Sequence, residues 1–187
     1  MIENMQLTPC TNSDFVSLER MQYLQDGVAR TWDIAKVHDS VAILLYHKER
    51  DAFVLVKQFR PPVYLKNGDG YTYELCAGIV DKDKSLVAIA QEEIDEECGY
   101  LLTEDSISKI TSFYTAVGFA GAEQTLYYAE VDEGLHMHAG GGIDVENIEV
   151  VYLKVSEAKK FIFDESKAKT PGVMYAFMWW FENINNV

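Results

Sequence analysis

The stretch "AQEEIDEECG", residues 90–99, places five carboxylates within six consecutive positions. Side chains three and four residues apart share one side of a helix, so these acids crowd together if the stretch is helical. Half-buried carboxylates at that spacing raise one another's pKa and destabilise the fold unless something positive lies between them. Oxygen ligands suit Mg²⁺ or Mn²⁺. The run therefore indicates either a divalent-cation site or, as with most charge runs, a solvated acidic face.

The residues around this run predict a helix over 86–98. Ser85 is suited to cap its first turn, and Gly99 to end it in the left-handed conformation. At about 100° per residue, the helix has one apolar arc roughly 100° wide. That arc consists of Leu86, Val87, Ala90 and Ile94.

The acids fall at different angles around this helix. Glu97 is expected inside the apolar arc, Glu93 roughly 20° beyond one edge, and Glu96 roughly 80° beyond the same edge. Asp95 lies beyond the opposite edge and Glu92 near the back. Three carboxylates, at i, i+3 and i+4, therefore share one border of the buried face, and these three are the candidate metal ligands.

The longer stretch "GIVDKDKSLVAIAQEEIDEECGY", residues 78–100, resembles the Nudix box, G-x5-E-x7-R-E-U-x-E-E-x-G-U, in which U is a bulky apolar residue. The positions that fall on this pattern without a gap are Gly78, Glu93, Ile94, Glu96, Glu97, Gly99 and Tyr100. The resemblance implies an α/β fold, the Nudix-type α/β/α sandwich with a mixed β-sheet. It also implies a hydrolase in which a loop, a helix and a loop hold divalent cations against a diphosphate.

The resemblance carries roles to particular residues. Glu93 and Glu97 match the main metal ligands, and the backbone carbonyl of Ala77 matches a further oxygen ligand. Glu96 matches an assisting ligand and is also a candidate catalytic residue. The implied cofactor is Mg²⁺, with Mn²⁺ as an alternative.

Two positions depart from the Nudix box. Lys84 stands where the family has Glu, and Glu92 stands where it has Arg. One hypothesis is a charge-reversed pair that braces the helix as the family's pair does. The other is that both side chains are solvated and the apolar arc alone holds the helix, since exposed ion pairs contribute only ~0–1 kcal/mol.

The resemblance extends through most of the chain from about residue 27, in "WDIAKVHDSVAILLYHKERDAFVLVKQFRPPVY", "YTYELCAGIVD", "GGGIDVENIEVVYL" and "KTPGVMYAF". These segments are similar to the UDP-sugar pyrophosphatases and the related ADP-ribose pyrophosphatases. The implied function is metal-dependent hydrolysis of a nucleoside diphosphate sugar, with UDP-glucose giving UMP and glucose 1-phosphate. ADP-ribose hydrolysis is one alternative. An inactive nucleotide-sugar-binding protein is another, raised by residues 84 and 92.

A general base is needed near the metals. By resemblance it comes from the loop before the last strand, where Glu146 is the first candidate and Asp144 the second. The glycines of "GGG" would let that loop close over substrate. The alternative is that Glu146 is only an acid at a loop end.

Four further residues are candidates for substrate binding. Arg60 matches an arginine that contacts phosphates, and a surface arginine is the alternative. Glu74 is a sugar-binding or supporting acid, or else a strand-end acid that faces water. Glu123 could reach the site from a flexible loop, or be solvated. Trp32 could stack on the base, or be buried in its hairpin.

The elements that must position these residues follow from the apolar pattern. Strands are expected at 17–25, 28–36, 40–47, 51–59, 71–75, 110–117, 124–131 and 148–155. Pro61 and Pro62 are expected to end a strand, Ser156 to cap one helix, and Thr170 before Pro171 to open another. Residues 1–38 are expected to form an N-terminal antiparallel β extension, and residues 39–187 the Nudix hydrolase domain.

Composition limits the partners. The chain has 187 residues and a net charge of −14, so it is a poor general binder of nucleic acid or anionic membrane. No signal peptide or membrane-spanning run is evident, and three cysteines without a CxxC pair favour a reduced, cytoplasmic protein. The expected partners are a nucleoside diphosphate sugar and a second copy. A homodimer is expected because the N-terminal hairpin is too apolar to stay exposed alone, and in the resembling enzymes it exchanges between subunits.

Overall fold

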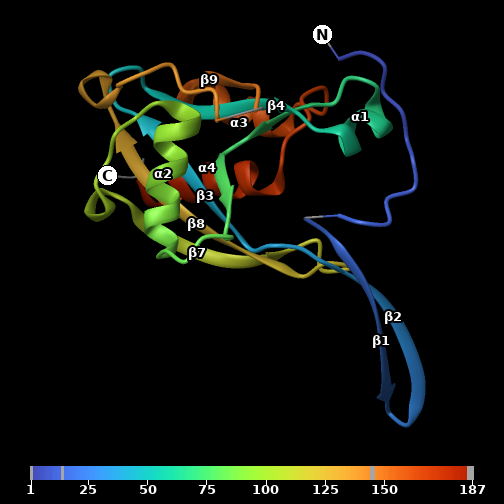
Figure 1. The fold of residues 1–187 in the computed structure, drawn as a ribbon. Helices are drawn as coiled ribbons and strands as arrows, with labels where there is room; N and C mark the ends of the chain where they lie inside the picture. The colour runs from blue at the N-terminus through green and yellow to red at the C-terminus, as the bar shows by residue number, and fades with distance from the viewer. Residues whose placement is uncertain (1, 14, 144–145, 185–187) are drawn as a thin grey trace.

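The computed structural model describes residues 2–13, 15–143 and 146–184. Its strands are β1 (Ser17–Gln25), β2 (Val28–Lys36), β3 (Ser40–His47), β4 (Ala52–Phe59), β5 (Tyr71–Glu74), β6 (Cys76–Ile79), β7 (Ser108–Thr115), β8 (Ala122–Val131) and β9 (Ile148–Lys154). Its helices are α1 (Pro61–Asn67), α2 (Leu86–Cys98), α3 (Val155–Phe163) and α4 (Pro171–Asn183), with short 3₁₀ turns η1 (Glu104–Ser106) and η2 (Glu133–Leu135). Figure 1 shows their arrangement.

Seven of the strands form one mixed sheet. Its main order is β5-β4-β3-β8-β7, with β6 added beside β3 and β9 beside β4. The pairing of β3 with β8 is parallel, and the other pairings of this sheet are antiparallel. The β-branched and apolar residues of β3 and β4 are almost all buried, as expected for strands covered on both faces.

The segment from β5 to β6 crosses between two neighbouring strands. β5 pairs with β4, where Glu74 lies opposite Val56, and β6 then pairs with β3, where Ala77 lies opposite Ala42. This crossing places Glu74 and Ala77 close together at the point where β3 and β4 part.

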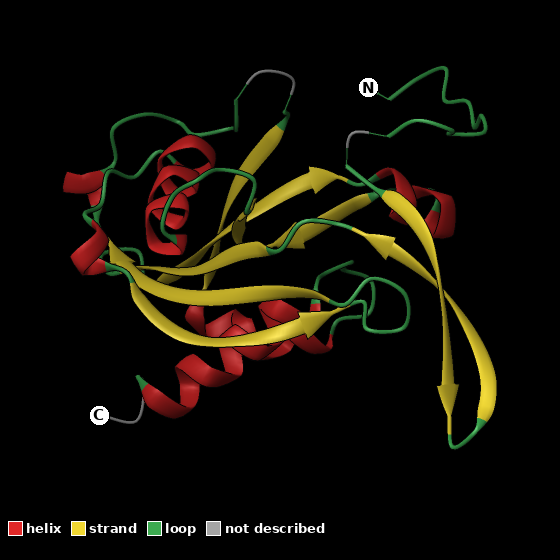
Figure 2. Ribbon diagram, turned by 60° about the horizontal axis from the view of Figure 1, so that its bottom comes forward, coloured by secondary structure: helices red, strands yellow, loops and turns green. Residues whose placement is uncertain are grey.

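Helices cover both faces of the sheet. On one face, α2 contributes Ile89 and Ile94 to a core that also contains the buried Tyr100. On the other face, α4 packs Phe177 onto Phe53 of β4, with ring centroids 4.3 Å apart. Figure 2 shows the sheet between its helices. The predicted α/β/α sandwich with a mixed sheet is confirmed.

Helix α2 has the predicted boundaries. The Ser85 hydroxyl accepts the Ala88 N–H at 3.1 Å, and Gly99 ends the helix with φ 74°. Gly99 is required for space as well, because a Cβ there would lie 1.9 Å from the carbonyl oxygen of His138.

Of two local predictions, one is confirmed and one was wrong. Pro61 and Pro62 follow the end of β4 as predicted, and they also begin α1, which the sequence did not indicate, because proline at the first helical positions gives up no intrahelical hydrogen bond. Helix α3 begins at Val155 with Lys154 at the N-cap, so Ser156 lies inside its first turn and does not cap it. Thr170 is the N-cap of α4, as predicted.

The β1–β2 hairpin forms a separate two-stranded sheet that extends away from the rest of the chain (Figures 1 and 2). Asp26 and Gly27 make its tight turn with φ angles of 52° and 77°. The hairpin leaves large apolar side chains in solvent, and Leu18 is 82% exposed. None of the described helices is long and apolar enough to cross a membrane.

Candidate active site

Helix α2 has Glu97 on its buried side and Glu93 and Glu96 along the border of that side, as the angles around the helix predicted. Glu97 is 4% exposed, and Glu93 and Glu96 are half-buried. The Ala77 N–H donates to Oε2 of Glu97 at 2.9 Å, which joins the helix to β6. The acidic border of α2 therefore faces the strand segment that carries Ala77.

Gly78 is the residue that allows this close approach. A Cβ at Gly78 would lie 2.1 Å from Cδ and Oε1 of Glu93. No side chain larger than hydrogen fits there unless Glu93 moves. The glycine of the motif therefore serves to bring β6 against the acidic side of the helix.

The buried acids repel one another. Burial, followed by the charge of Glu96, raises the pKa of Glu93 to about 7. Burial raises the pKa of Glu97 to about 8, against the stabilising hydrogen bond from Ala77, and the nearby Glu93 and Glu146 raise it further. Oxygen donors with unbalanced negative charge fit a divalent cation, which would remove this repulsion. The described residues of this site therefore suit the implied metal.

The glycine-rich loop before β9 is fastened to the end of α2. Gly141 donates its N–H to the carbonyl of Glu97 at 2.9 Å, and Gly142 donates to the carbonyl of Glu96 at 3.0 Å. A Cβ on Gly142 would lie 2.4 Å from Oε2 of Glu146. The loop therefore holds Glu146 near the helix, close enough to raise the pKa of both Glu93 and Glu97. Asp144, the second candidate base, lies outside the described residues.

Oε2 of Glu146 is held in turn by its own loop. It accepts the Ile143 N–H at 3.1 Å, and the Glu146 N–H returns to the Ile143 carbonyl at 3.0 Å. These two contacts orient the Glu146 carboxylate within its loop.

Arg60 and Glu74 form a bidentate pair. Nε and Nη2 of Arg60 lie 2.8 and 2.9 Å from the two carboxylate oxygens of Glu74. Burial alone would raise the pKa of Glu74, but Arg60 and Thr72 lower it below its usual value. Glu74 is therefore not a water-facing strand-end acid. Arg60 keeps 46% of its side chain exposed. Its pKa is raised mainly by Glu74, and the charges of Glu97 and Glu146 add to this effect, so it lies near the acidic site.

The structure does not join the other two substrate candidates to the acidic group. Glu123 lies near the start of β8, where its backbone N–H bonds to Asp39, and its carboxylate makes no hydrogen bond or ion pair with a described residue. Trp32 is 52% exposed on β2, so the alternative of a buried hairpin tryptophan is wrong. Its indole N–H donates to the carbonyl of Gly118 at 2.9 Å.

A cavity of about 410 Å³ lies beside Glu74 and Ala77, between the sheet and the start of α4. Its walls come from β7, β8, and the first residues of α4. They include Phe113, Tyr114, Thr115, Ala116, Gln124, Thr170, Pro171 and Gly172. Two residues of the acidic region thus also line a cavity large enough for a small organic group.

Comparison with known proteins gives the family. No family model matches the chain. The uridine diphosphate glucose pyrophosphatase NUDT14 of Bos taurus is 36% identical over an alignment of 212 positions, gaps included, which covers 98% of this chain and 96% of that relative. The chain belongs to the Nudix hydrolases. The NUDT14 protein of Mus musculus is also 36% identical, over 94% of this chain and 92% of its own. A GDP-mannose pyrophosphatase of Cronobacter sakazakii is 37% identical over 64% of this chain and 62% of its own length.

The two departures of this Nudix hydrolase from the family motif contact each other. Lys84 binds Oε1 of Glu92, and Lys82 binds Oε2 of the same carboxylate at 3.0 Å. The charge-reversed pair is therefore confirmed, and Glu92 is held by two cations rather than one. Sequence analysis missed Lys82, although "DKDK" offered a second lysine two positions before Lys84.

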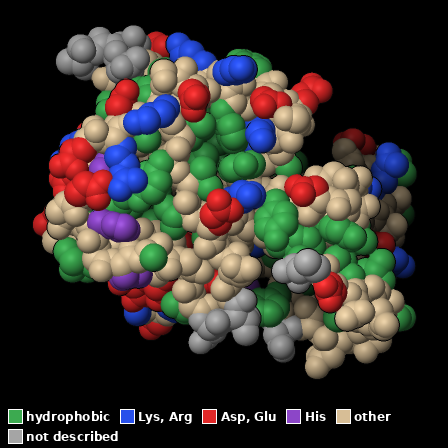
Figure 3. Space-filling model, turned by 90° about the horizontal axis from the view of Figure 1, so that it is seen from above, with side chains coloured by type: hydrophobic (Ala, Val, Ile, Leu, Met, Phe, Trp, Pro, Cys, Tyr) green, Lys and Arg blue, Asp and Glu red, His purple; other side chains and the backbone are tan. Residues whose placement is uncertain are grey.

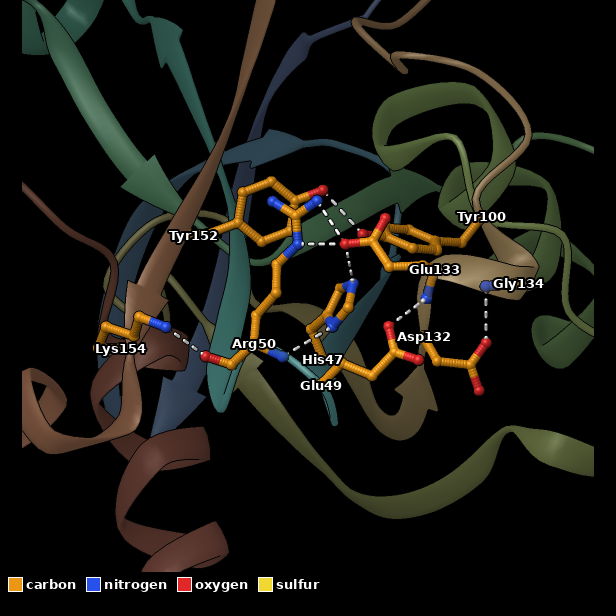
Figure 4. Close-up of polar contacts among 9 residues, drawn as sticks. All are labelled: His47, Glu49, Arg50, Tyr100, Asp132, Glu133, Gly134, Tyr152 and Lys154. Atoms are coloured by element: carbon orange, nitrogen blue, oxygen red, sulfur yellow. Dashed lines mark hydrogen bonds and ion pairs between the residues drawn. The ribbon is translucent and has the colours of Figure 1, made fainter.

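A second group of ligand-type residues, separate from the acids of α2, is shown in Figure 4. His47, Glu49 and Glu133 place one atom each within 4.8 Å of one another and could hold a metal ion. However, Arg50 already binds Oε1 of Glu133 at 2.6 Å, and Nδ1 of His47 accepts the Arg50 N–H at 3.3 Å. That bond leaves the proton of a neutral His47 on Nε2, the atom that faces Glu133. The positive charge of Arg50 and the proton on Nε2 of His47 both disfavour a cation there. We therefore interpret the group as a structural contact between the β3–β4 turn and η2.

Proposed function

We propose that the chain hydrolyses the diphosphate of a nucleoside diphosphate sugar, with UDP-glucose as the preferred substrate and UMP and glucose 1-phosphate as products. The observation that carries the proposal is the presence of half-buried Glu93 and buried Glu97 side by side on the Nudix helix, where burial and neighbouring carboxylates raise the pKa of each. The names of the nearly full-length relatives support UDP-glucose. The GDP-mannose pyrophosphatases match a smaller part of the chain and make GDP-mannose the second candidate.

Glu93 and Glu97 would be the main metal ligands, with Glu96 and the carbonyl of Ala77 as further oxygens. Mg²⁺ suits this all-oxygen set, and Mn²⁺ is the alternative. When bound, the cation would neutralise the diphosphate and activate water for attack on phosphorus. Among the described residues, the cations near these acids already have carboxylate partners: Arg60 pairs with Glu74, and Lys82 and Lys84 pair with Glu92.

The remaining roles fall to the protein's own groups. Glu146 would take the proton from the attacking water, since its loop holds the carboxylate near Glu93 and Glu97. Arg60 would contact the phosphates with the part of its guanidinium that Glu74 leaves free, and Glu74 fixes its direction. Asp144 stays the second candidate for the base, and Glu123 a candidate that would have to approach substrate from the start of β8.

The cavity beside Glu74 and Ala77 would receive a part of the substrate other than the diphosphate. Every candidate presents the same diphosphate to the metal site, so the choice among substrates must arise in such a pocket. Pockets that hydrogen-bond one base or sugar discriminate strongly, because the wrong group leaves buried polar atoms unpaired.

The assembly that we propose is a cytosolic homodimer. Residues 1–38 would form the dimerising extension, and residues 39–187 the hydrolase domain. The exposed apolar side chains of β1 and β2 support an interface between copies. Figure 3 views the molecule from above and shows hydrophobic side chains among the charged ones on that face. The three free cysteines fit a reducing compartment.

The test is a substrate panel of UDP-glucose, GDP-mannose and ADP-ribose with Mg²⁺ at one pH, read as kcat/KM for each. We expect UDP-glucose to give the highest value. An ADP-ribose or GDP-mannose value equal to or above it would reassign the substrate and leave the metal helix untouched. No turnover of any member would favour the inactive binding protein instead.

A matched pair of variants in α2 tests the assignment of its acids as metal ligands. Glu97→Gln should lower kcat by at least ~10²-fold, the scale of losing a main electrostatic group of a site. Asp95→Asn lies on the same helix but points to His138, 3.0 Å away, and should stay within about a few-fold of the parent. Equal losses in the two variants would contradict the assignment of the acidic border.

A further inference from the structure

The loop at residues 116–121, between β7 and β8, makes few contacts that would fix its position relative to the rest of the chain. Val117 is 75% exposed and Phe119 is 58% exposed. Its internal hydrogen bonds all converge on one atom, the carbonyl oxygen of Ala116, which accepts the N–H groups of Phe119, Ala120 and Gly121. These bonds close the turn on itself but do not fix where the turn lies.

The backbone at the start of this loop is strained. Ala116 has φ 47°, a left-handed conformation that costs energy for a residue with a Cβ. Such a conformation persists only when surrounding contacts impose it. The core does not impose it here, because Ala116 and the three residues after it are exposed.

Strand β2 supplies the outside contacts. Nε1 of Trp32 donates to the carbonyl of Gly118 at 2.9 Å, and the N–H of Ala35 donates to the carbonyl of Phe119 at 2.8 Å. Among the described residues, these are the hydrogen bonds that join residues 116–121 to another element. Two consecutive carbonyls of the loop are thus tied to the N-terminal hairpin, which lies more than eighty positions earlier in the sequence.

The loop also contributes to the wall of the cavity described above. Ala116 lines the cavity next to Thr115, the last residue of β7. Thr115 is fixed in the sheet, where it pairs with Ala122 and its hydroxyl donates to the Ala122 carbonyl at 3.2 Å. A shift of the loop would therefore move Ala116 relative to the fixed Thr115 and change the shape of the cavity.

We propose that Trp32 is a positioning residue for the substrate cavity. Its indole N–H fastens the loop 116–121 to the hairpin and so keeps Ala116 in the cavity wall. This role differs from stacking on the base, because it depends on the N–H group and not on the ring face. The part of the proposal that concerns substrate rests on the proposed function, whereas the fastening of the loop does not.

Trp32→Phe separates the two roles, since it keeps an aromatic face and removes the donor. We expect the KM for UDP-glucose to rise about threefold to tenfold, the scale of one neutral hydrogen bond, with kcat within about twofold. We also expect faster amide hydrogen exchange at Ala35, whose N–H would lose its carbonyl partner as the loop detaches. Trp32→Ala should give no larger change in Ala35 exchange than Trp32→Phe.

Tyr23→Phe is the matched control, because it removes a polar hydrogen from another exposed aromatic ring of the same hairpin. It should leave both KM and Ala35 exchange unchanged. Parental Ala35 exchange in Trp32→Phe overturns the proposal, whatever the activity. A parental KM together with faster exchange overturns its substrate part alone. If no nucleoside diphosphate sugar is turned over, the proposed function fails, and the exchange measurement still decides whether Trp32 fastens the loop.

Discussion

Of the site's acids, Glu97 has the least favourable environment for a negative charge. It is almost fully buried, and Glu93 and Glu146 lie close enough to add to the cost of its charge. The hydrogen bond from the Ala77 N–H stabilises the charged form of Glu97, but its effect is smaller than that of burial, so the pKa stays well above its ordinary value of 4.5. A metal-free site therefore holds a proton on Glu97 at neutral pH, and a bound cation would displace that proton.

This raised pKa predicts how stability depends on pH. The folded state keeps a proton on Glu97 up to about pH 8, while the unfolded chain releases it near 4.5. The folded metal-free protein thus binds more protons between these values. The contribution of Glu97 to the free energy of unfolding is complete below pH 4.5 and is lost as pH rises through about 8.

The measurement is thermal unfolding in EDTA at pH 6.5 and 8.5. Metal-free wild-type protein should lose more stability over this range than Glu97→Gln, whose amide does not titrate. Adding Mg²⁺ should stabilise the wild type more at pH 8.5 than at pH 6.5, because the cation competes with the proton. Identical pH slopes for the wild type and the variant would contradict the raised pKa.

At the scale of elements, the sequence was most informative where local rules agree. The Ser85 cap, the apolar arc and Gly99 all mark one helix, so both ends of α2 were predictable. Helix α1 was not, because its short "PPVYLKN" run offers no buried residue and its prolines fit a strand end equally well. The pairing of Arg60 with Glu74 was also hidden, since it depends on β4 and β5 being neighbours in the sheet.

The start of α2 offers a test of the reversed charges. Lys84→Glu should lower stability, because it places a second carboxylate beside Glu92, and adding Glu92→Arg should restore much of the loss. Coupling is expected to stay at or below ~1 kcal/mol, as for other exposed pairs. Lys82, which also binds Glu92, reduces the effect of Lys84→Glu and is repelled in Glu92→Arg.

The measurement is a double-mutant cycle from urea unfolding of the parent, both single variants and the double variant. Lys109→Glu is the control, because Lys109 is an exposed lysine of β7 that forms no ion pair with a described residue. Strictly additive effects would mean that the contact between residues 84 and 92 contributes nothing to folding.

At the scale of the whole molecule, a single chain does not explain why the β1–β2 hairpin exposes so many large apolar side chains. Directly opposite residues of β1 and β2 share a face, and both faces carry apolar side chains. Leu18 and Leu24 lie on one face, at 82% and 74% exposure, and Met21 lies opposite Trp32 on the other. An isolated two-stranded hairpin is at best marginally stable in water, so this one requires a covering surface.

A second copy of the chain is the cover that we predict. Light scattering at micromolar concentration should give twice the chain mass of 21.2 kDa. Leu18→Lys combined with Leu24→Lys should shift this mass toward one chain, because two charges would be buried in the interface. Gln22→Lys is the matched control, since it adds a charge to the same face without removing an apolar group, and it should leave most of the protein dimeric.

Because the hairpin also holds the loop beside the cavity through Trp32, the monomeric variant should bind substrate more weakly than the control. A parent protein with the mass of a single chain would contradict both the dimer and this link between assembly and the cavity.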